Sequence, residues 1–117
     1  MISTGFPRTL LLTRWLFATA LSGVLVLSLL PMDHPDFSPN DKLNHLLAYG
    51  GLMVLGALSW RNLWWVAGGV FMWGVGIEGL QGLTPYRYFS LADMLANASG
   101  VLLGWMGYFG VRKLWVR

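Results

Sequence analysis

Four long apolar stretches, separated by short polar segments, run along the chain. They cover about residues 10–30, 43–60, 63–83 and 91–111. Each stretch has 18 to 21 residues, which is about 27–32 Å of α-helix at 1.5 Å per residue. The hydrocarbon core of a bilayer is about 30 Å thick. The pattern therefore predicts an all-α integral membrane bundle of four transmembrane helices with short loops, forming one domain over residues 1–117.

Composition excludes the other classes of protein. Hydrophobic residues make up 56% of the chain and charged residues 11%, whereas a soluble domain has about 25% charged residues. A chain with so few charges cannot cover the surface of a small soluble fold, and its apolar content excludes intrinsic disorder. Because cysteine is absent, disulfides, thiolate metal ligands and cysteine nucleophiles are excluded as well.

The first apolar stretch has the features of a signal peptide that is not removed. Arg8 and Arg14 come before most of the apolar run, as in a secretory signal. The run ends at Leu29-Leu30-Pro31-Met32, which offers no small-x-small cleavage site. We therefore expect a retained signal anchor.

The distribution of charge predicts the orientation in the membrane. If the N-terminus is cytoplasmic, the inner side carries six cations and no acidic residue, and the outer side carries Lys42, Arg87 and all five acidic residues. Inner loops are normally enriched in Lys and Arg, so an N-in/C-in topology is expected. The six inner cations are Arg8, Arg14, Arg61, Arg112, Lys113 and Arg117. Because these cations do not cluster on one amphipathic face, the net charge of +3 does not indicate a nucleic-acid partner.

Polar residues within the second, third and fourth spans lie at similar depth. Counted from the span midpoints, His45, Glu78, Gln81, Asp93 and Asn97 lie about 6–12 Å toward the outer side. A charged residue within a span costs about 2.5–3.5 kcal/mol on insertion scales and usually faces a protein interior or an aqueous cavity. These residues therefore predict an outward-facing polar pocket. They are Asp41, Lys42, His45 and Tyr49 in the second span, Glu78 and Gln81 in the third, and Asp93 and Asn97 in the fourth.

Two stripes of small and polar residues predict which helices pack together. The stripe on the fourth span is about 80° wide at 100° per residue, and its glycines allow close approach of a neighbouring helix. A matching stripe follows the third span, so we expect spans two, three and four to pack against each other. The fourth-span stripe is Asp93, Asn97, Gly100, Gly104 and Gly107, and the third-span stripe is Ala67, Phe71, Gly74, Glu78 and Gln81.

The order of these motifs resembles that of the VanZ-like family of small membrane proteins. The motifs are Asp41-Lys42-Leu43-Asn44-His45 with Tyr49, Glu78-Gly79-Leu80-Gln81, Pro85, Arg87, and Asp93-Met94-Leu95-Ala96-Asn97 with Gly100 and Gly104. Tyr86 stands where the family often has a glycine. The resemblance implies a multi-pass protein of the bacterial plasma (inner) membrane in an envelope context related to glycopeptide (teicoplanin) susceptibility. It implies no particular reaction.

The residues suggest roles in a binding or catalytic site. His45 and Glu78 are candidates for general acid–base work, with Asp93 orienting the histidine. Lys42 and Arg87 suit an anionic group. The other candidate ligand-binding residues are Asp41, Tyr49, Gln81 and Asn97.

Structural roles compete with each of these functional ones. Asp41 and Asp93 could cap helices, Gln81 and Asn97 could hold helices together, and Glu78 could pair within the fold. His45, Glu78 and Asp93 together could ligate zinc or iron. No pair of closely spaced histidines supports this, so no metal or other cofactor is expected.

Three functions remain open on the sequence. The first is binding, or processing, of an anionic envelope or lipid-linked molecule at the outer leaflet. The second is a non-enzymatic structural subunit of a membrane complex, either as a homo-oligomer or with another membrane protein. The third is a small transporter or ion pathway. The residues leave open whether the chain is an enzyme.

Overall fold

The structure is a computed structural model that describes residues 8–30, 39–85 and 90–113, with the backbone alone at residues 39–41. It contains α1 (Arg8–Leu29), α2 (Pro39–Ser59), α3 (Leu63–Gly82) and α4 (Leu91–Val111). No strand occurs in these ranges, so the all-α prediction is confirmed. The helices contain 20 to 22 residues, or about 30–33 Å each.

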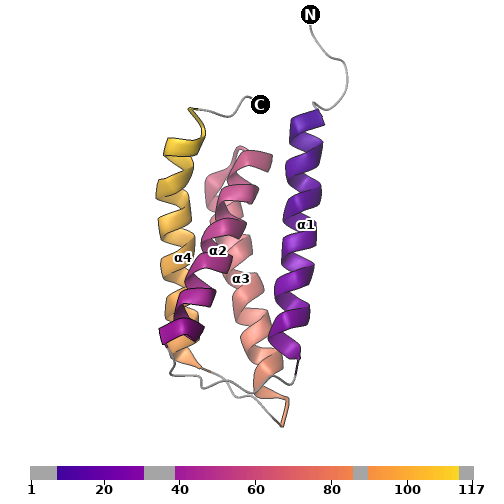
Figure 1. Cartoon of the computed structure of the whole chain (residues 1–117), viewed down its shortest axis with the longest axis vertical. Helices are drawn as coiled ribbons and strands as arrows, with labels where there is room; N and C mark the ends of the chain where they lie inside the picture. The colour runs from indigo at the N-terminus through magenta and orange to yellow at the C-terminus, as the bar shows by residue number, and fades with distance from the viewer. Residues whose placement is uncertain (1–7, 31–38, 86–89, 114–117) are drawn as a thin grey trace, which may run out of the picture.

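The four helices run alternately up and down and form a bundle (Figure 1). One end, which we call the arginine end, contains the start of α1, the turn between α2 and α3, and the end of α4, with Arg8, Arg61 and Arg112. At the opposite end, the polar end, α2 and α4 begin and α3 finishes. α2 packs against the other three helices, most extensively against α4.

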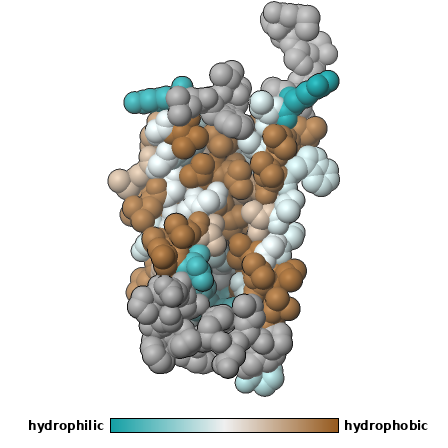
Figure 2. All heavy atoms as spheres, in the orientation of Figure 1, coloured by the Kyte–Doolittle hydropathy of each residue, from teal (hydrophilic) through white to brown (hydrophobic). Residues whose placement is uncertain are grey.

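Three helices are long and apolar enough to cross a membrane, namely α1, α3 and α4. The expected second span, α2, is less apolar because Lys42, Asn44 and His45 lie in its first turns. The face of the bundle in Figure 2 is mostly hydrophobic between its ends, with a small hydrophilic area in its lower half, toward the polar end. The helices thus suit a lipid bilayer, while a fourth span through α2 and the N-in/C-in orientation remain predictions.

The helix boundaries follow local sequence signals. The Asn62 side chain accepts a hydrogen bond from Trp65 N at 3.2 Å and begins α3. The Ser90 hydroxyl accepts one from Asp93 N at 3.2 Å and begins α4. Both satisfy backbone N–H groups that have no partner within the helix. α2 starts at Pro39, before the expected apolar stretch, because proline in a first turn has no N–H to leave unpaired.

Glycines bring the backbones of α2 and α4 together. A Cβ added at Gly100 would lie 2.5 Å from Leu46 O, and one added at Gly104 would lie 2.4 Å from Gly50 O. Neither position has room for a side chain, so the close approach predicted from the glycine stripe is confirmed there. Gly107 differs, because a Cβ at that position would meet nothing within 4 Å.

The buried faces of α3 and α4 are rotated slightly from the expected stripes. On α4 the buried face continues from Gly104 to Tyr108 rather than to Gly107. Four residues advance a helix by 400°, so Tyr108 lies only about 40° from Gly104 in projection, whereas Gly107 lies about 60° away on the other side. On α3, Ala67 and Phe71 are half-buried. The buried residues of α3 are Val66, Val70, Gly74, Ile77, Glu78 and Gln81.

α1 is attached to the other helices near both of its ends. At the arginine end, Arg14 Nε donates to Ser59 O at 3.2 Å, and the guanidinium carbon lies 4.9 Å from the centre of the Trp60 ring. At the polar end, Gln81 Nε2 donates to Ser28 O at 2.8 Å. Ser59 is the last residue of α2, so Arg14 satisfies a carbonyl at the negative end of that helix.

Arg14→Met is therefore expected to lower the free energy of unfolding by about 1–2 kcal/mol, because it removes a charged hydrogen bond and a cation–π contact. Unfolding of the detergent-solubilised protein, followed by circular dichroism, measures this loss. Arg8→Met is the control, since Arg8 is exposed on the same helix. Equal stability of the two variants would contradict the role given to Arg14.

Candidate functional site

Polar side chains from three helices meet at the polar end of the bundle. α2 contributes Lys42 and His45, α3 contributes Glu78 and Gln81, and α4 contributes Asp93 and Asn97. Four of them are almost inaccessible: Glu78, Gln81, Asp93 and Asn97 are each at most 2% exposed. Of the other candidates, Tyr49 is buried one turn further along α2 than His45, toward the arginine end. The Asp41 side chain and Arg87 lie outside the described residues.

Asp93 is the centre of the charged contacts. Its Oδ1 accepts a hydrogen bond from the Lys42 ammonium group, and its Oδ2 lies 3.6 Å from His45 Nε2. Asp93 lies in the first turn of α4, where the positive end of the helix dipole also favours a carboxylate. One carboxylate thus holds two basic side chains of α2 against α4.

His45 is held from both sides of its ring. Its Nδ1 lies 2.8 Å from Asn97 Oδ1. Because an amide oxygen can only accept, Nδ1 is the donor in this arrangement, and Nε2 is directed toward Asp93. The Asn97 amide in turn lies in a tight junction, since a Cβ at Gly74 would be 2.9 Å from Asn97 Nδ2 and 2.9 Å from a ring carbon of Tyr49. Gly74 is therefore needed where the three helices meet.

Glu78 joins α3 to the start of α4. Its Oε1 accepts a hydrogen bond from Ser90 N at 2.8 Å, and Ser90 in turn caps α4 through Asp93 N. The bond between Glu78 and Ser90 has no signal in the sequence, because it depends on where α4 begins relative to α3.

Gln81 serves a different helix from the rest of the cluster. Its amide nitrogen bonds to Ser28 O of α1, while its Oε1 is buried with no hydrogen-bond partner among the described residues. This arrangement agrees with a role in holding helices together. Its involvement with a ligand remains a prediction.

Exposure divides the cluster into an accessible edge and a buried interior. The Lys42 side chain is 27% exposed and that of His45 is 15% exposed, against 2% for Asp93. The described residues contain no group of three His, Asp or Glu side chains placed as metal ligands. The accessible groups are thus an ammonium and an imidazole, and the acidic groups lie behind them.

The bond to Ser90 gives a prediction for Glu78. Glu78→Gln keeps an oxygen that can accept from Ser90 N, so its expected cost in folding stability is about 1 kcal/mol. Glu78→Ala loses that acceptor and leaves a cavity, so about 3 kcal/mol is expected. Chemical unfolding in detergent measures both. If the two substitutions cost the same, the negative charge of Glu78, and not its bond to Ser90, would be what stabilises the fold.

Comparison with known proteins gives one match. Residues 14–113 match the model of the VanZ/LLP1 family. The matched range includes the polar cluster and all but the ends of the chain. No curated protein and no solved structure matches the chain. The match agrees with the resemblance drawn from the motifs between Asp41 and Gly104. The chain belongs to the VanZ/LLP1 family.

Proposed function

We propose that the polar end binds the anionic headgroup of an envelope or lipid-linked molecule, whose hydrocarbon tail lies along the apolar helices. One observation carries the proposal: Asp93 holds Lys42 and His45 at the accessible edge of the cluster. The Asp93 side chain itself is only 2% exposed. A buried carboxylate that orients two accessible basic groups produces a preorganised site for an anion.

The ligand classes that suit this site share a phosphate or carboxylate beside a long apolar chain. A polyprenyl-linked sugar phosphate, a phospholipid headgroup and a lipid-bearing glycopeptide all have this chemistry. Arg87 is expected to add a second cation, since Pro85 and Ser90 on either side of its loop belong to the polar end. The family's relation to glycopeptide susceptibility is consistent with such an envelope ligand.

If the bound molecule is also processed, His45 is the strongest candidate for proton transfer. Its ring is partly exposed, and Asn97 and Asp93 fix its orientation, as general acid–base catalysis requires. Asp93 would orient the imidazole. Glu78 is buried and bonded to Ser90, which supports a positioning role more than direct contact with a ligand.

Binding is tested with polyprenyl monophosphate by calorimetry in detergent, with the neutral polyprenol as the matched ligand. We expect the phosphate to bind and the alcohol not to bind. Lys42→Met/Asp93→Asn removes both charges of the ion pair together and is expected to weaken binding at least tenfold, the value of one charged hydrogen bond. Arg112→Gln changes a cation at the other end and should leave affinity unchanged. Equal binding of both ligands, or equal losses in both variants, would refute the proposal.

A structural role in a membrane complex is the second candidate. It is favoured by the mutual bonding of the buried groups, which hold α2, α3 and α4 together. This role predicts that substitutions in the cluster change stability and assembly while polyprenyl phosphate does not bind to the native protein. The calorimetric titration therefore distinguishes the two functions.

Transport receives less support from the described residues. A path through the bundle needs polar groups along its whole length. In the half toward the arginine end, the buried described residues with a hydroxyl are Thr13, Ser59 and Tyr108. The hydroxyls of Thr13 and Ser59 bond to the carbonyls of Leu10 and Leu55, within single helices.

A further inference from the structure

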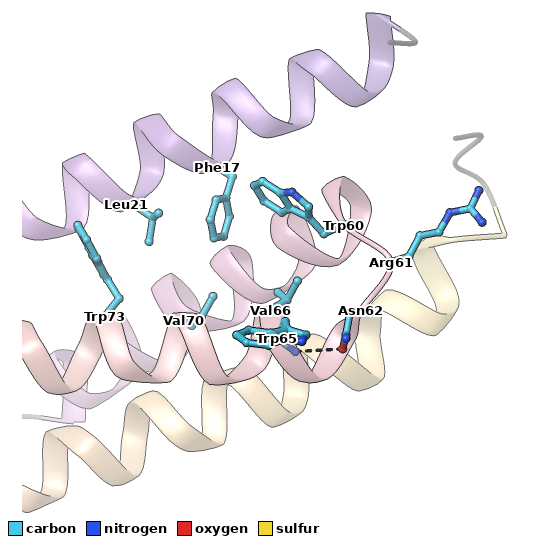
Figure 3. A pocket seen from close by; sticks show the side chains of 10 residues that line it. Phe17, Leu21, Trp60, Arg61, Asn62, Trp65, Val66, Val70 and Trp73 are labelled. Atoms are coloured by element: carbon cyan, nitrogen blue, oxygen red, sulfur yellow. Dashed lines mark hydrogen bonds between the residues drawn. The ribbon is translucent and has the colours of Figure 1, made fainter. Parts of the chain in front are cut away.

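An apolar groove lies between α1 and α3 at the arginine end, far from the polar cluster (Figure 3). Its volume is about 510 Å³. Phe17 and Leu21 of α1 face Val66 and Val70 of α3 across it, and Trp60 and Trp73 flank these residues (Figure 3). The groove exists because α1 contributes few buried residues to the bundle; only Thr13 of its described residues is buried.

A second groove adjoins the first on the outer surface of α3. Its volume is about 570 Å³, and it shares Asn62, Trp65 and Gly69 with the first groove. Trp65 is 79% exposed and lines both grooves. Gly69 forms part of both, and a Cβ added to it would meet nothing within 4 Å. The surface thus offers two adjoining apolar grooves.

A cation stands where the grooves reach the end of the bundle. Arg61 lies in the turn between α2 and α3 and lines the first groove. It is exposed, and it makes no hydrogen bond or ion pair with any other described residue. The acidic residues described with side chains, Glu78 and Asp93, are at the polar end. Among the described residues, no acidic side chain therefore lies near Arg61, and its guanidinium is open to an anion of another molecule.

We propose that one anionic diacyl phospholipid of the bilayer binds here, with its phosphate at Arg61 and its acyl chains in the two grooves. Each part of that lipid meets its chemical complement. The guanidinium pairs with phosphate, the tryptophans suit the interface between headgroups and hydrocarbon, and the grooves are apolar. Basic groups at the end of a groove between membrane helices are a known arrangement for anionic headgroups.

Native mass spectrometry of the full chain in detergent tests this assignment. The probes are dioleoylphosphatidylglycerol and dioleoylphosphatidylcholine at equal concentration, which share acyl chains and differ in charge. The wild-type protein is expected to retain phosphatidylglycerol about fivefold more than phosphatidylcholine, as one cation near a membrane surface provides. Arg61→Gln is expected to reduce that ratio to about one. Gly69→Leu fills the grooves and is expected to reduce retention of both lipids.

Matched controls separate this site from general effects. Arg112→Gln removes a cation of the same end that does not line the grooves, and Gly76→Leu adds the same side chain to an open position of α3 outside them. Both should keep the wild-type ratio. Equal retention of the two lipids by the wild type, the same loss in Arg112→Gln as in Arg61→Gln, or a dimer that retains no lipid would overturn the proposal.

Discussion

Gly104→Ala is expected to destabilise the protein by about 3 kcal/mol, at the upper end of the range for overpacked cores. The new methyl carbon would lie 2.4 Å from Gly50 O and 2.9 Å from Met53 Cβ. The first of these atoms belongs to a helix backbone and cannot move aside as a flexible side chain can. Relief of the clash requires α2 and α4 to separate, and this is the most extensive helix contact in the structure.

Gly107→Ala is the matched control for this prediction. It makes the same chemical change one turn away on α4, where the added carbon meets nothing within 4 Å. A stabilisation of up to about 1 kcal/mol is expected from the higher helix propensity of alanine. Unfolding of both variants in detergent, followed by far-ultraviolet circular dichroism, gives the comparison. Similar stabilities would mean that α2 and α4 do not pack through Gly104.

Lys42→Met is expected to cost about 3 kcal/mol of folding stability. The substitution keeps an unbranched side chain but leaves the Asp93 carboxylate, which is 2% exposed, without its ammonium partner. Removing one member of a buried ion pair typically costs about 3–5 kcal/mol, because an uncompensated charge stays behind. The lower end applies because Lys42 is partly exposed and His45 Nε2 remains 3.6 Å from the carboxylate.

The double variant Lys42→Met/Asp93→Asn separates the charge effect from packing. Asparagine has nearly the shape of aspartate and carries no charge, and the substitution keeps the backbone N–H of residue 93 that donates to the Ser90 hydroxyl. More than half of the stability lost in Lys42→Met should therefore return. A double variant as unstable as the single one would show that the ammonium group acts through packing, and the ion pair would not be what holds α2 to α4.

The helices and the meeting of the polar residues could be predicted, because both depend on the lengths and the order of the apolar stretches. The length of an apolar stretch determines the length of a helix. The alternation of direction places Lys42, Glu78 and Asp93 at one end. Charged side chains within apolar stretches are costly to expose to lipid, so they are expected to face each other inside the bundle.

Other contacts could not be predicted, because they depend on how whole helices rotate and tilt. The polar residues of α1 do not gather on one face, so its sequence does not indicate which face meets α3, and the groove beside Phe17 and Trp60 has no sequence signal. The bond of Glu78 to Ser90 depends on where α4 begins relative to α3. Tyr108 is buried where Gly107 was expected, because a rotation of α4 by less than the 100° between successive residues decides which position faces the bundle.

The most direct test of the central claim is nuclear magnetic resonance of the histidine ring nitrogens. The chain has two histidines, His34 and His45, and His45→Gln assigns their signals in protein labelled with ¹⁵N-histidine. Titration with polyprenyl monophosphate is predicted to shift the His45 signals saturably, while neutral polyprenol leaves them in place. If the His45 signals stay unchanged when polyprenyl monophosphate is in large excess over the protein, a headgroup site at the polar end would be contradicted.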